Sequence, residues 1–141
     1  MRRIVAATAL FLTVAGLPAL SADGGTDGNH ALTGAEFEAI VTGRTMYYSS
    51  GDQPYGVEQY KPDRQVTWAF VGDDCRNGEW YEDSGYICFV YEDEPDPQCW
   101  TFYNGPDGLM AHFRDNPAGA PLVAVQQSPE PMACLGPDIG V

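Results

Sequence analysis

Residue types that could carry out catalysis are few in this chain. His112 alternates with an apolar set on a predicted strand, so we expect it to face solvent. A general base there would need an orienting carboxylate, and with twenty acidic residues such proximity arises by chance. Ser84 lies in Asp83-Ser84-Gly85, which is typical of a hairpin turn, and the chain has no G-x-S-x-G motif. The sequence therefore predicts no catalytic residue.

Residue types that bind metals are present but are not arranged as a known site. The acidic run 92–96 lacks the regular alternation and the central glycine of a calcium loop, so we expect a solvated loop there. Met110 and His112 share one strand face, yet a copper site would need a third ligand. The sequence predicts neither a metal nor another cofactor.

Tyrosines are the side chains most suited to recognition. The chain has 17 Phe, Trp and Tyr residues, which is a high load for 141 residues. Buried packing explains some of them, but the tyrosines exceed what a core needs, and tyrosine is a common contact residue on sheet surfaces and at barrel mouths. We therefore predict a binding surface made of Tyr47, Tyr48, Tyr55, Tyr60, Tyr81 and Tyr86.

The N-terminal segment is typical of an export signal. Arg2 and Arg3 precede an apolar run that extends to about Gly16, and a proline and small residues follow. We expect cleavage near Ser21 or Ala22 and a periplasmic or secreted protein. The run is too short for a confident membrane span, so we expect no transmembrane segment in the mature chain.

An exported chain with an even number of cysteines is expected to form disulfides. Four cysteines allow three pairings. In the pairing that we favour, one disulfide closes a single hairpin and the other ties a loop to the C-terminal end of the chain. A metal or redox centre has little support because there is no C-x-x-C motif. The favoured pairs are Cys88 with Cys99 and Cys75 with Cys134.

The charge balance restricts the partners. Two of the seven Lys and Arg residues lie in the signal, which leaves five against twenty acidic residues and a net charge of −15. Nucleic acid is a poor partner because its phosphates would be repelled, whereas a cationic partner would be attracted. The alternative explanation is that the negative charge only keeps a secreted protein soluble.

The elements that must position these residues are mainly β. Thr33 and Glu36 form a T-x-x-E capping box that predicts one short helix, with Gly43 as its stop. Eight strands separated by Gly, Pro and Asp turns follow, and their spacing favours an antiparallel meander that forms a small barrel or curled sheet. The predicted strands are 45–49, 57–61, 66–71, 78–82, 86–92, 99–104, 109–114 and 122–127.

We divide the chain into a signal peptide (1–22), a flexible leader (23–31), a β-meander domain (32–128) and a Pro- and Gly-rich C-terminal strap (129–141). Alternation predicts which side chains fill the core. These are Val66, Trp68 and Phe70; Ile87, Phe89 and Tyr91; Trp100 and Phe102; and Leu109, Ala111 and Phe113.

The order of these features resembles a group of small exported proteobacterial proteins classed as domains of unknown function, with a lipocalin-like β-meander. The likeness rests on Leu32-Thr33-Gly34-Ala35-Glu36, Lys61-Pro62-Asp63, Gly78-x-Trp80, Cys88-Phe89-x-Tyr91 and Cys99-Trp100, and it covers most of residues 32–104. The resemblance implies the fold and the Cys88–Cys99 pair, and it implies no activity.

These observations favour a non-enzymatic, envelope-associated β-module that binds a protein or small ligand of unknown identity. One alternative is an inhibitor of a cationic cell-wall hydrolase such as lysozyme, which an acidic protein could approach by electrostatic steering. Another is a small hydrolase that uses a carboxylate pair or His112.

Overall fold

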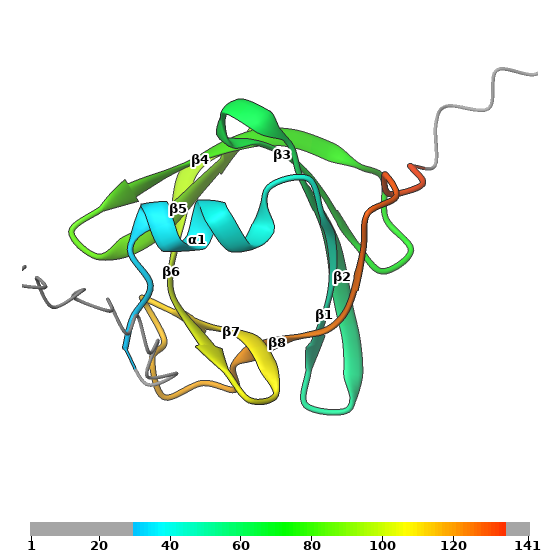
Figure 1. The fold of residues 1–141 in the computed structure, drawn as a ribbon. Helices are drawn as coiled ribbons and strands as arrows, with labels where there is room; N and C mark the ends of the chain where they lie inside the picture. Colours follow the sequence, from blue (N-terminus) through cyan, green and yellow to red (C-terminus); the bar gives the residue numbers. More distant parts are fainter. Residues whose placement is uncertain (1–29, 135–141) are drawn as a thin grey trace, which may run out of the picture.

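The computed structural model of the protein describes residues 30–134. The predicted signal peptide lies outside these residues, as do 23–29 of the predicted leader and 135–141 of the predicted strap. The described chain consists of one α-helix followed by eight antiparallel strands, which form a closed barrel (Figure 1). The predicted mainly β fold is therefore confirmed, and of the two forms considered the barrel is the correct one.

Each strand pairs with the next along the chain, and the last pairs back with the first. A short 3-10 turn, η1 (Pro62–Arg64), connects the second strand to the third. The elements are α1 (Gly34–Val41), β1 (Thr45–Ser50), β2 (Gln53–Tyr60), β3 (Gln65–Phe70), β4 (Arg76–Asp83), β5 (Tyr86–Tyr91), β6 (Glu94–Gly105), β7 (Gly108–Phe113) and β8 (Leu122–Ser128).

All eight predicted strands are present, but β2 and β6 begin at least four residues earlier than predicted. β2 starts at Gln53 because a tight turn, with Gly51 at φ +58°, lets Gln53 pair directly with Ser50. β6 starts at Glu94, which pairs with Tyr91, so most of the acidic run lies in a strand and our expectation of a loop over 92–96 was wrong. Pro95 and Pro97 are tolerated because this part of β6 pairs with β5 alone.

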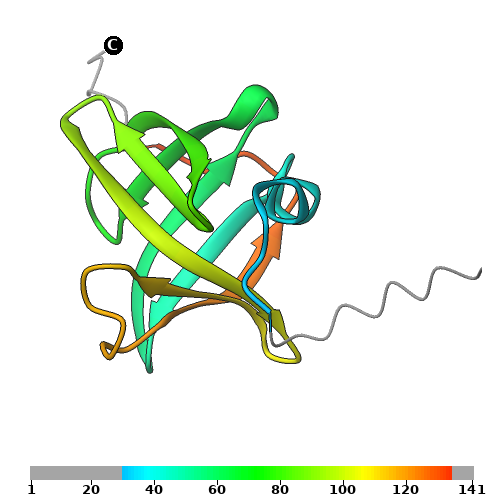
Figure 2. The same ribbon diagram turned by 90° about the vertical axis from the view of Figure 1, so that its left-hand side faces the viewer.

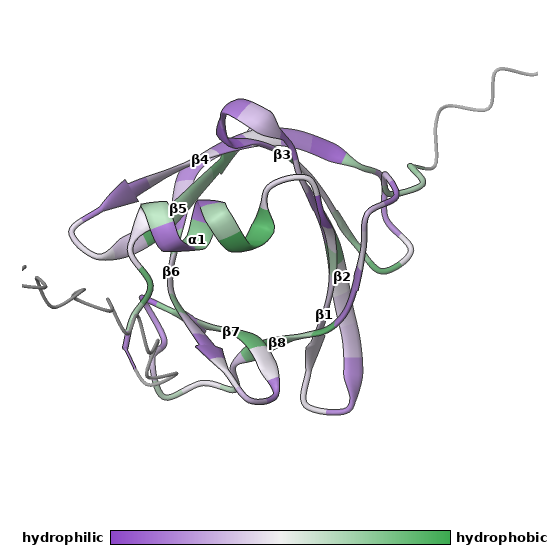
Figure 3. Ribbon diagram, viewed as in Figure 1, coloured by the Kyte–Doolittle hydropathy of each residue, from purple (hydrophilic) through white to green (hydrophobic). Residues whose placement is uncertain are grey.

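Helix α1 begins and ends where the sequence predicted. The Thr33 hydroxyl accepts a hydrogen bond from the Glu36 amide at 3.3 Å, and the Glu36 carboxylate accepts one from the Thr33 amide at 2.9 Å. Gly43 has a φ of +79°, which a side chain would strain. The last turn of the helix is its most hydrophobic part (Figure 3).

The helix covers one end of the barrel (Figure 2). The Phe37 side chain is fully buried there, with its ring centroid 4.4 Å from that of Phe102 and 5.0 Å from that of Trp80. The start of β1 at Thr45 and the end of β2 at Tyr60 lie beside α1. The Gly43 amide donates a hydrogen bond to the Tyr60 carbonyl there. Consequently the opposite end of the barrel is the one that α1 does not cover.

The barrel interior holds most of the predicted core. Phe70 is an exception, since it is 37% exposed, and the Tyr91, Trp100 and Phe113 side chains are only partly buried. The predicted core residues that are buried are Val66, Trp68, Ile87, Phe89, Phe102, Leu109 and Ala111.

Both favoured disulfides are confirmed. Cys88 and Cys99 lie directly opposite each other on β5 and β6, with their Cα atoms 4.0 Å apart. Cys75, the residue that precedes β4, forms a disulfide with Cys134 in the C-terminal segment. Across residues 30–134, no helix has the length and apolar character of a membrane span.

Candidate functional site

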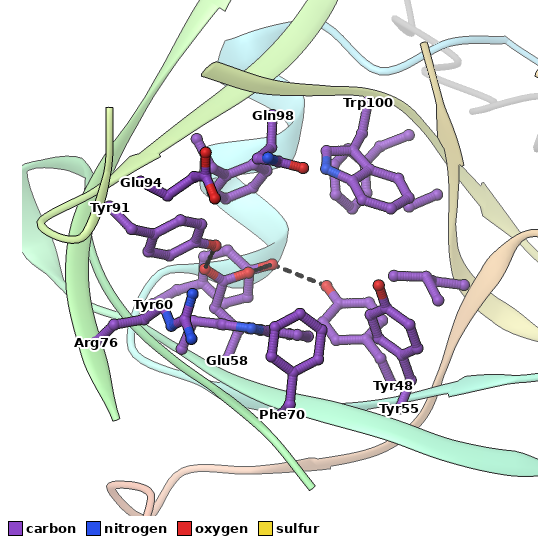
Figure 4. Close-up of a pocket in the computed structure, with 15 residues that line it drawn as sticks. Tyr48, Tyr55, Glu58, Tyr60, Phe70, Arg76, Tyr91, Glu94, Gln98 and Trp100 are labelled. Carbon is purple, nitrogen blue, oxygen red and sulfur yellow. Dashed lines mark hydrogen bonds between the residues drawn. The ribbon is translucent and has the colours of Figure 1, made fainter. Parts of the chain in front are cut away.

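A cavity of about 130 Å³ lies in the barrel, and its lining residues Tyr55, Phe70 and Arg76 stand near the strand ends opposite those beside α1. Side chains from all eight strands line it, and many of them converge on its centre (Figure 4). The lining residues are Tyr48, Tyr55, Glu58, Tyr60, Trp68, Phe70, Arg76, Phe89, Tyr91, Glu94, Gln98, Trp100, Phe102, Ala111 and Leu122.

The mouth of the cavity has an aromatic wall. The rings of Tyr55, Trp68 and Phe70 lie with centroids 5.3–6.0 Å apart, in edge-on or tilted arrangements that aromatic pairs prefer. Gly56 makes this packing possible, because a Cβ there would overlap the Trp68 indole. The wall therefore gives this side of the cavity an aromatic lining.

A buried carboxyl group lies inside the cavity. Glu58 is 4% exposed, and its carboxylate accepts hydrogen bonds from the Tyr91 hydroxyl at 2.7 Å and the Tyr60 hydroxyl at 3.0 Å. The Tyr60 hydroxyl also lies 2.8 Å from that of Tyr48, so four oxygen-bearing side chains from β1, β2 and β5 form one chain (Figure 4). We call Tyr48, Glu58, Tyr60 and Tyr91 the Glu58 cluster.

Burial controls the protonation of this cluster. Loss of hydration raises the pKa of Glu58 to about 8, although the hydrogen bonds from Tyr91 and Tyr60 act in the opposite direction. Burial likewise raises the pKa values of Tyr48, Tyr60 and Tyr91, and the neighbouring Glu58 charge adds to this. At neutral pH the cluster is therefore mostly uncharged, with its carboxyl group protonated.

One cationic side chain, Arg76 of β4, also lines the cavity. Its Nη1 lies 3.3 Å from Asp93, and its guanidinium lies 5.5 Å from the centre of the Phe70 ring. Its Nε atom is buried and has no hydrogen-bond acceptor among the described residues. This N–H is therefore a buried donor without an acceptor, which is rare in folded proteins and unfavourable.

Taken together, the lining offers aromatic faces, hydroxyl groups and one guanidinium N–H. None of the fifteen lining residues is a histidine, serine or cysteine, and the carboxyl groups among them are Glu58 and Glu94. What the arrangement can do chemically is hold an apolar group against the rings and a polar atom against the buried donors.

The structure does not bring the six predicted tyrosines together. Tyr48, Tyr55 and Tyr60 line the cavity, and two of these are buried in the barrel interior. Tyr81 is 38% exposed, while Tyr47 and Tyr86 are partly buried, and these three are not among the lining residues.

The remaining candidates lie elsewhere. His112 is partly buried on β7, with its ring centroid 5.9 Å from that of Tyr103, and it lines none of the three best-formed cavities of the described region. Ser84 occupies the β4–β5 turn with φ +54°, as a hairpin turn requires. No cluster of three His, Cys, Asp or Glu side chains within residues 30–134 could hold a metal ion.

Sequence reasoning missed Glu58 and Arg76. One signal for Glu58 was available: it lies two residues before Tyr60, so the two share a strand face, and Gly56 continues that face. Arg76 carried no such signal, since β4 begins there and was predicted only from Gly78.

By its fold the protein is a closed eight-stranded antiparallel β-barrel with a cavity at one end. No protein-family model, curated protein or solved structure matches the chain.

Proposed function

We propose that the protein is a non-enzymatic binding protein that holds a small, partly aromatic molecule in the barrel cavity. The observation that carries this proposal is the combination of an aromatic wall and a buried polar cluster around one space. Small-molecule sites share this composition, with mostly apolar walls and a few convergent polar groups. An apolar cavity of roughly 150 Å³ holds benzene, so a volume of about 130 Å³ suits one aromatic ring.

Three tryptophans make the proposal testable. Trp68 and Trp100 line the cavity, whereas Trp80 packs against Phe37 beneath the helix and provides an internal control. In a titration with ethylbenzene, acetophenone and 1-phenylethylamine, followed by the indole N–H signals in NMR, we expect shifts at Trp68 and Trp100 and none at Trp80. If none of the three probes moves the Trp68 and Trp100 signals, the cavity is not a binding site.

A cavity-filling variant provides the matched control. Ala111 is buried and lines the cavity, so Ala111→Leu should occupy part of the space and weaken binding. Val125→Leu is the control, because Val125 is 64% exposed and lies outside the cavity. Equal affinities in the two variants would indicate that the probes bind elsewhere.

We also propose that the protein is exported, with residues 1–22 as its signal. Two disulfides support this, because disulfides persist in oxidising compartments. Cell fractionation, with mass analysis of the mature N-terminus, tests it. Cleavage near Ser21 or Ala22 is expected, and a cytoplasmic chain that retains Met1 would contradict the proposal.

A second candidate function is inhibition of a cationic cell-wall hydrolase such as lysozyme. It is favoured by the excess of twenty acidic over five basic residues after residue 22. A complex with a basic lysozyme should form at low ionic strength and weaken steeply with salt, and no complex at low ionic strength would eliminate this candidate. The form of the hydrolase alternative that uses His112 gains no support, because His112 does not line the cavity, whereas the carboxyl groups of Glu58 and Glu94 do.

A further inference from the structure

We infer that the cavity selects a neutral ligand with an aromatic body and one carbonyl oxygen, which accepts a hydrogen bond from a hydroxyl group of the Glu58 cluster. This inference rests on the proposed binding function and specifies its ligand class. It depends on the number of protons in the cluster and on a second donor at the cavity.

The Glu58 cluster contains one more proton than it can use internally. With Glu58 neutral, the three tyrosines and the carboxyl group carry four O–H donors, but only three hydrogen bonds join them. One O–H group is therefore left over however the protons are arranged. All four side chains line the cavity, so in every arrangement the surplus donor belongs to a side chain of the cavity wall.

Arg76 provides the second donor. Arg76 lines the same cavity, and its Nε–H is buried and has no acceptor in the described part of the chain. Two unpaired donors favour a ligand that brings an acceptor, because a buried donor without an acceptor is unfavourable. A carbonyl oxygen has two lone pairs and could accept from either donor.

Charged ligands fit the same lining less well. An ammonium group would lie in a cavity that already contains the Arg76 guanidinium, and it would first require the buried carboxyl of Glu58 to ionise. A carboxylate would encounter Glu94 at the cavity and the negative charge of the whole chain. A neutral carbonyl avoids both penalties.

Ionisation of Glu58 should remove the surplus donor. A carboxylate carries no proton, so three O–H donors then serve three hydrogen bonds and all of them are used within the cluster. The groups that surround Glu58 are Tyr48, Tyr60 and Tyr91, and the charged side chains that share the cavity are Arg76 and Glu94. Carbonyl binding should thus weaken as the pH rises through about 8, the pKa of Glu58.

Four probes of similar size test the inference: acetophenone, ethylbenzene, 1-phenylethylammonium and benzoate. Their dissociation constants would be measured by the Trp68 and Trp100 indole signals at about pH 6 and about pH 9.5. We expect acetophenone to bind about 5–10-fold more tightly than ethylbenzene at the lower pH, as one net hydrogen bond allows. This preference should shrink at the higher pH, where the Arg76 donor alone remains.

Two variants connect the result to the cluster. Glu58→Gln keeps amide donors but cannot titrate, so the preference for acetophenone should become independent of pH. Tyr91→Phe removes a hydrogen bond that lowers the pKa of Glu58, so the loss of preference should move to higher pH. If Glu58→Gln does not fold, the shift in Tyr91→Phe still decides the question. Glu79→Gln, an exposed carboxylate on β4, is the control and should behave as the parent protein.

The contrary outcomes are distinct. Equal affinities for acetophenone and ethylbenzene would overturn the ligand class but leave the binding function intact. Tightest binding of 1-phenylethylammonium, strengthening with pH, would show that Glu58 serves as a counter-ion instead. A preference for acetophenone that is the same at both pH values in the parent protein would overturn the role of the cluster. Failure of all four probes to move the Trp68 and Trp100 signals would contradict the proposed function itself.

Discussion

Glu58 is the residue whose burial has the largest consequence for this protein. Its carboxyl group is 4% exposed and has a pKa of about 8, compared with about 4.5 in an unfolded chain. Between these two pH values the unfolded chain releases this proton while the folded chain keeps it. The free energy of unfolding should therefore fall as the pH rises from about 4.5 to about 8, and level off above that.

The Glu58→Gln variant tests this dependence because glutamine is similar in shape and does not titrate. Relative to the parent, the variant should gain a few kcal/mol of stability between about pH 4.5 and about pH 8, as measured by urea unfolding. Glu79→Gln is the control and should follow the parent across this range, since Glu79 is exposed. Parallel curves for Glu58→Gln and the parent would show that Glu58 ionises normally.

Tyr91 provides a second prediction at this scale. Tyr91→Phe removes the 2.7 Å hydrogen bond to Glu58 and should cost about 1 kcal/mol at neutral pH, which denaturant unfolding can measure. Tyr81→Phe is the matched control, because the Tyr81 ring is 38% exposed and should change stability little. An equal effect of the two substitutions would mean that the Tyr91 bond contributes nothing.

The sequence predicted little of the site at the residue scale. Tyr48, Tyr55 and Tyr60 were chosen as surplus aromatics, and the structure places them at the cavity. Glu58 was missed although it shares a strand face with Gly56 and Tyr60, because a glutamate in a strand is ordinarily expected to face solvent. Burial of a lone carboxyl becomes recognisable only when its hydroxyl partners, distant in sequence, are known.

At the scale of the elements, the two disulfides hold different parts of the barrel. The Cys88–Cys99 bond joins two neighbouring strands, and its cysteines are 11 residues apart in the sequence. The Cys75–Cys134 bond joins residues 59 positions apart and attaches the C-terminal segment to the residue before Arg76. Chain entropy gives about 3 kcal/mol for the first and about 4 kcal/mol for the second. The two bonds together therefore contribute a large part of the stability of a domain this size.

Paired Cys→Ser variants test this ordering. Removing both Cys75 and Cys134 should lower the free energy of unfolding by more than removing both Cys88 and Cys99, when each variant is compared with the parent in urea without reductant. The control is the fully reduced parent, which lacks both disulfides. Each variant keeps one disulfide and should therefore be at least as stable as this control. The reverse order would show that strain or residual structure outweighs loop length.

The strands were the best predicted elements, and the reason is physical. Gly, Pro and Asp turns interrupt an alternating pattern at short intervals, so the number and order of strands follow from local chemistry. Strand lengths were less predictable, because the early starts of β2 and β6 depend on pairing with a neighbour. The Cys88–Cys99 bridge agreed with the predicted register because the two residues lie opposite each other.

At the scale of the whole molecule, the charge balance affects stability. Beyond residue 22, twenty acidic side chains face five basic ones, and only four ion pairs occur in the described region, including one with a histidine. Mutual repulsion should therefore destabilise the barrel at low ionic strength, and the melting temperature should rise as salt is added from about 10 mM to about 300 mM.

The control for this effect is Glu58→Gln measured at about pH 6. Because Glu58 is buried and mostly neutral there, the variant should show the same rise with salt as the parent. A melting temperature that is unchanged or lowered by salt would contradict the repulsion. An abolished rise in the variant would assign the effect to Glu58 instead of the surface.

The closed barrel itself was one of two forms that the sequence allowed, and alternation alone could not choose between them. Closure depends on the pairing of β8 with β1, which joins residues about 80 positions apart. The cavity at the uncovered end was not predictable, because it depends on how far side chains from eight strands reach inward.

The most direct test of the central claim, that the cavity binds a neutral carbonyl compound, is a crystal structure of the protein with acetophenone at about pH 6. We predict that the ring lies between Tyr55, Trp68 and Trp100, with the carbonyl oxygen within hydrogen-bond distance of a hydroxyl of the Glu58 cluster or of the Arg76 Nε. Acetophenone bound only outside the barrel, or bound inside with its oxygen directed away from these donors, would contradict the account.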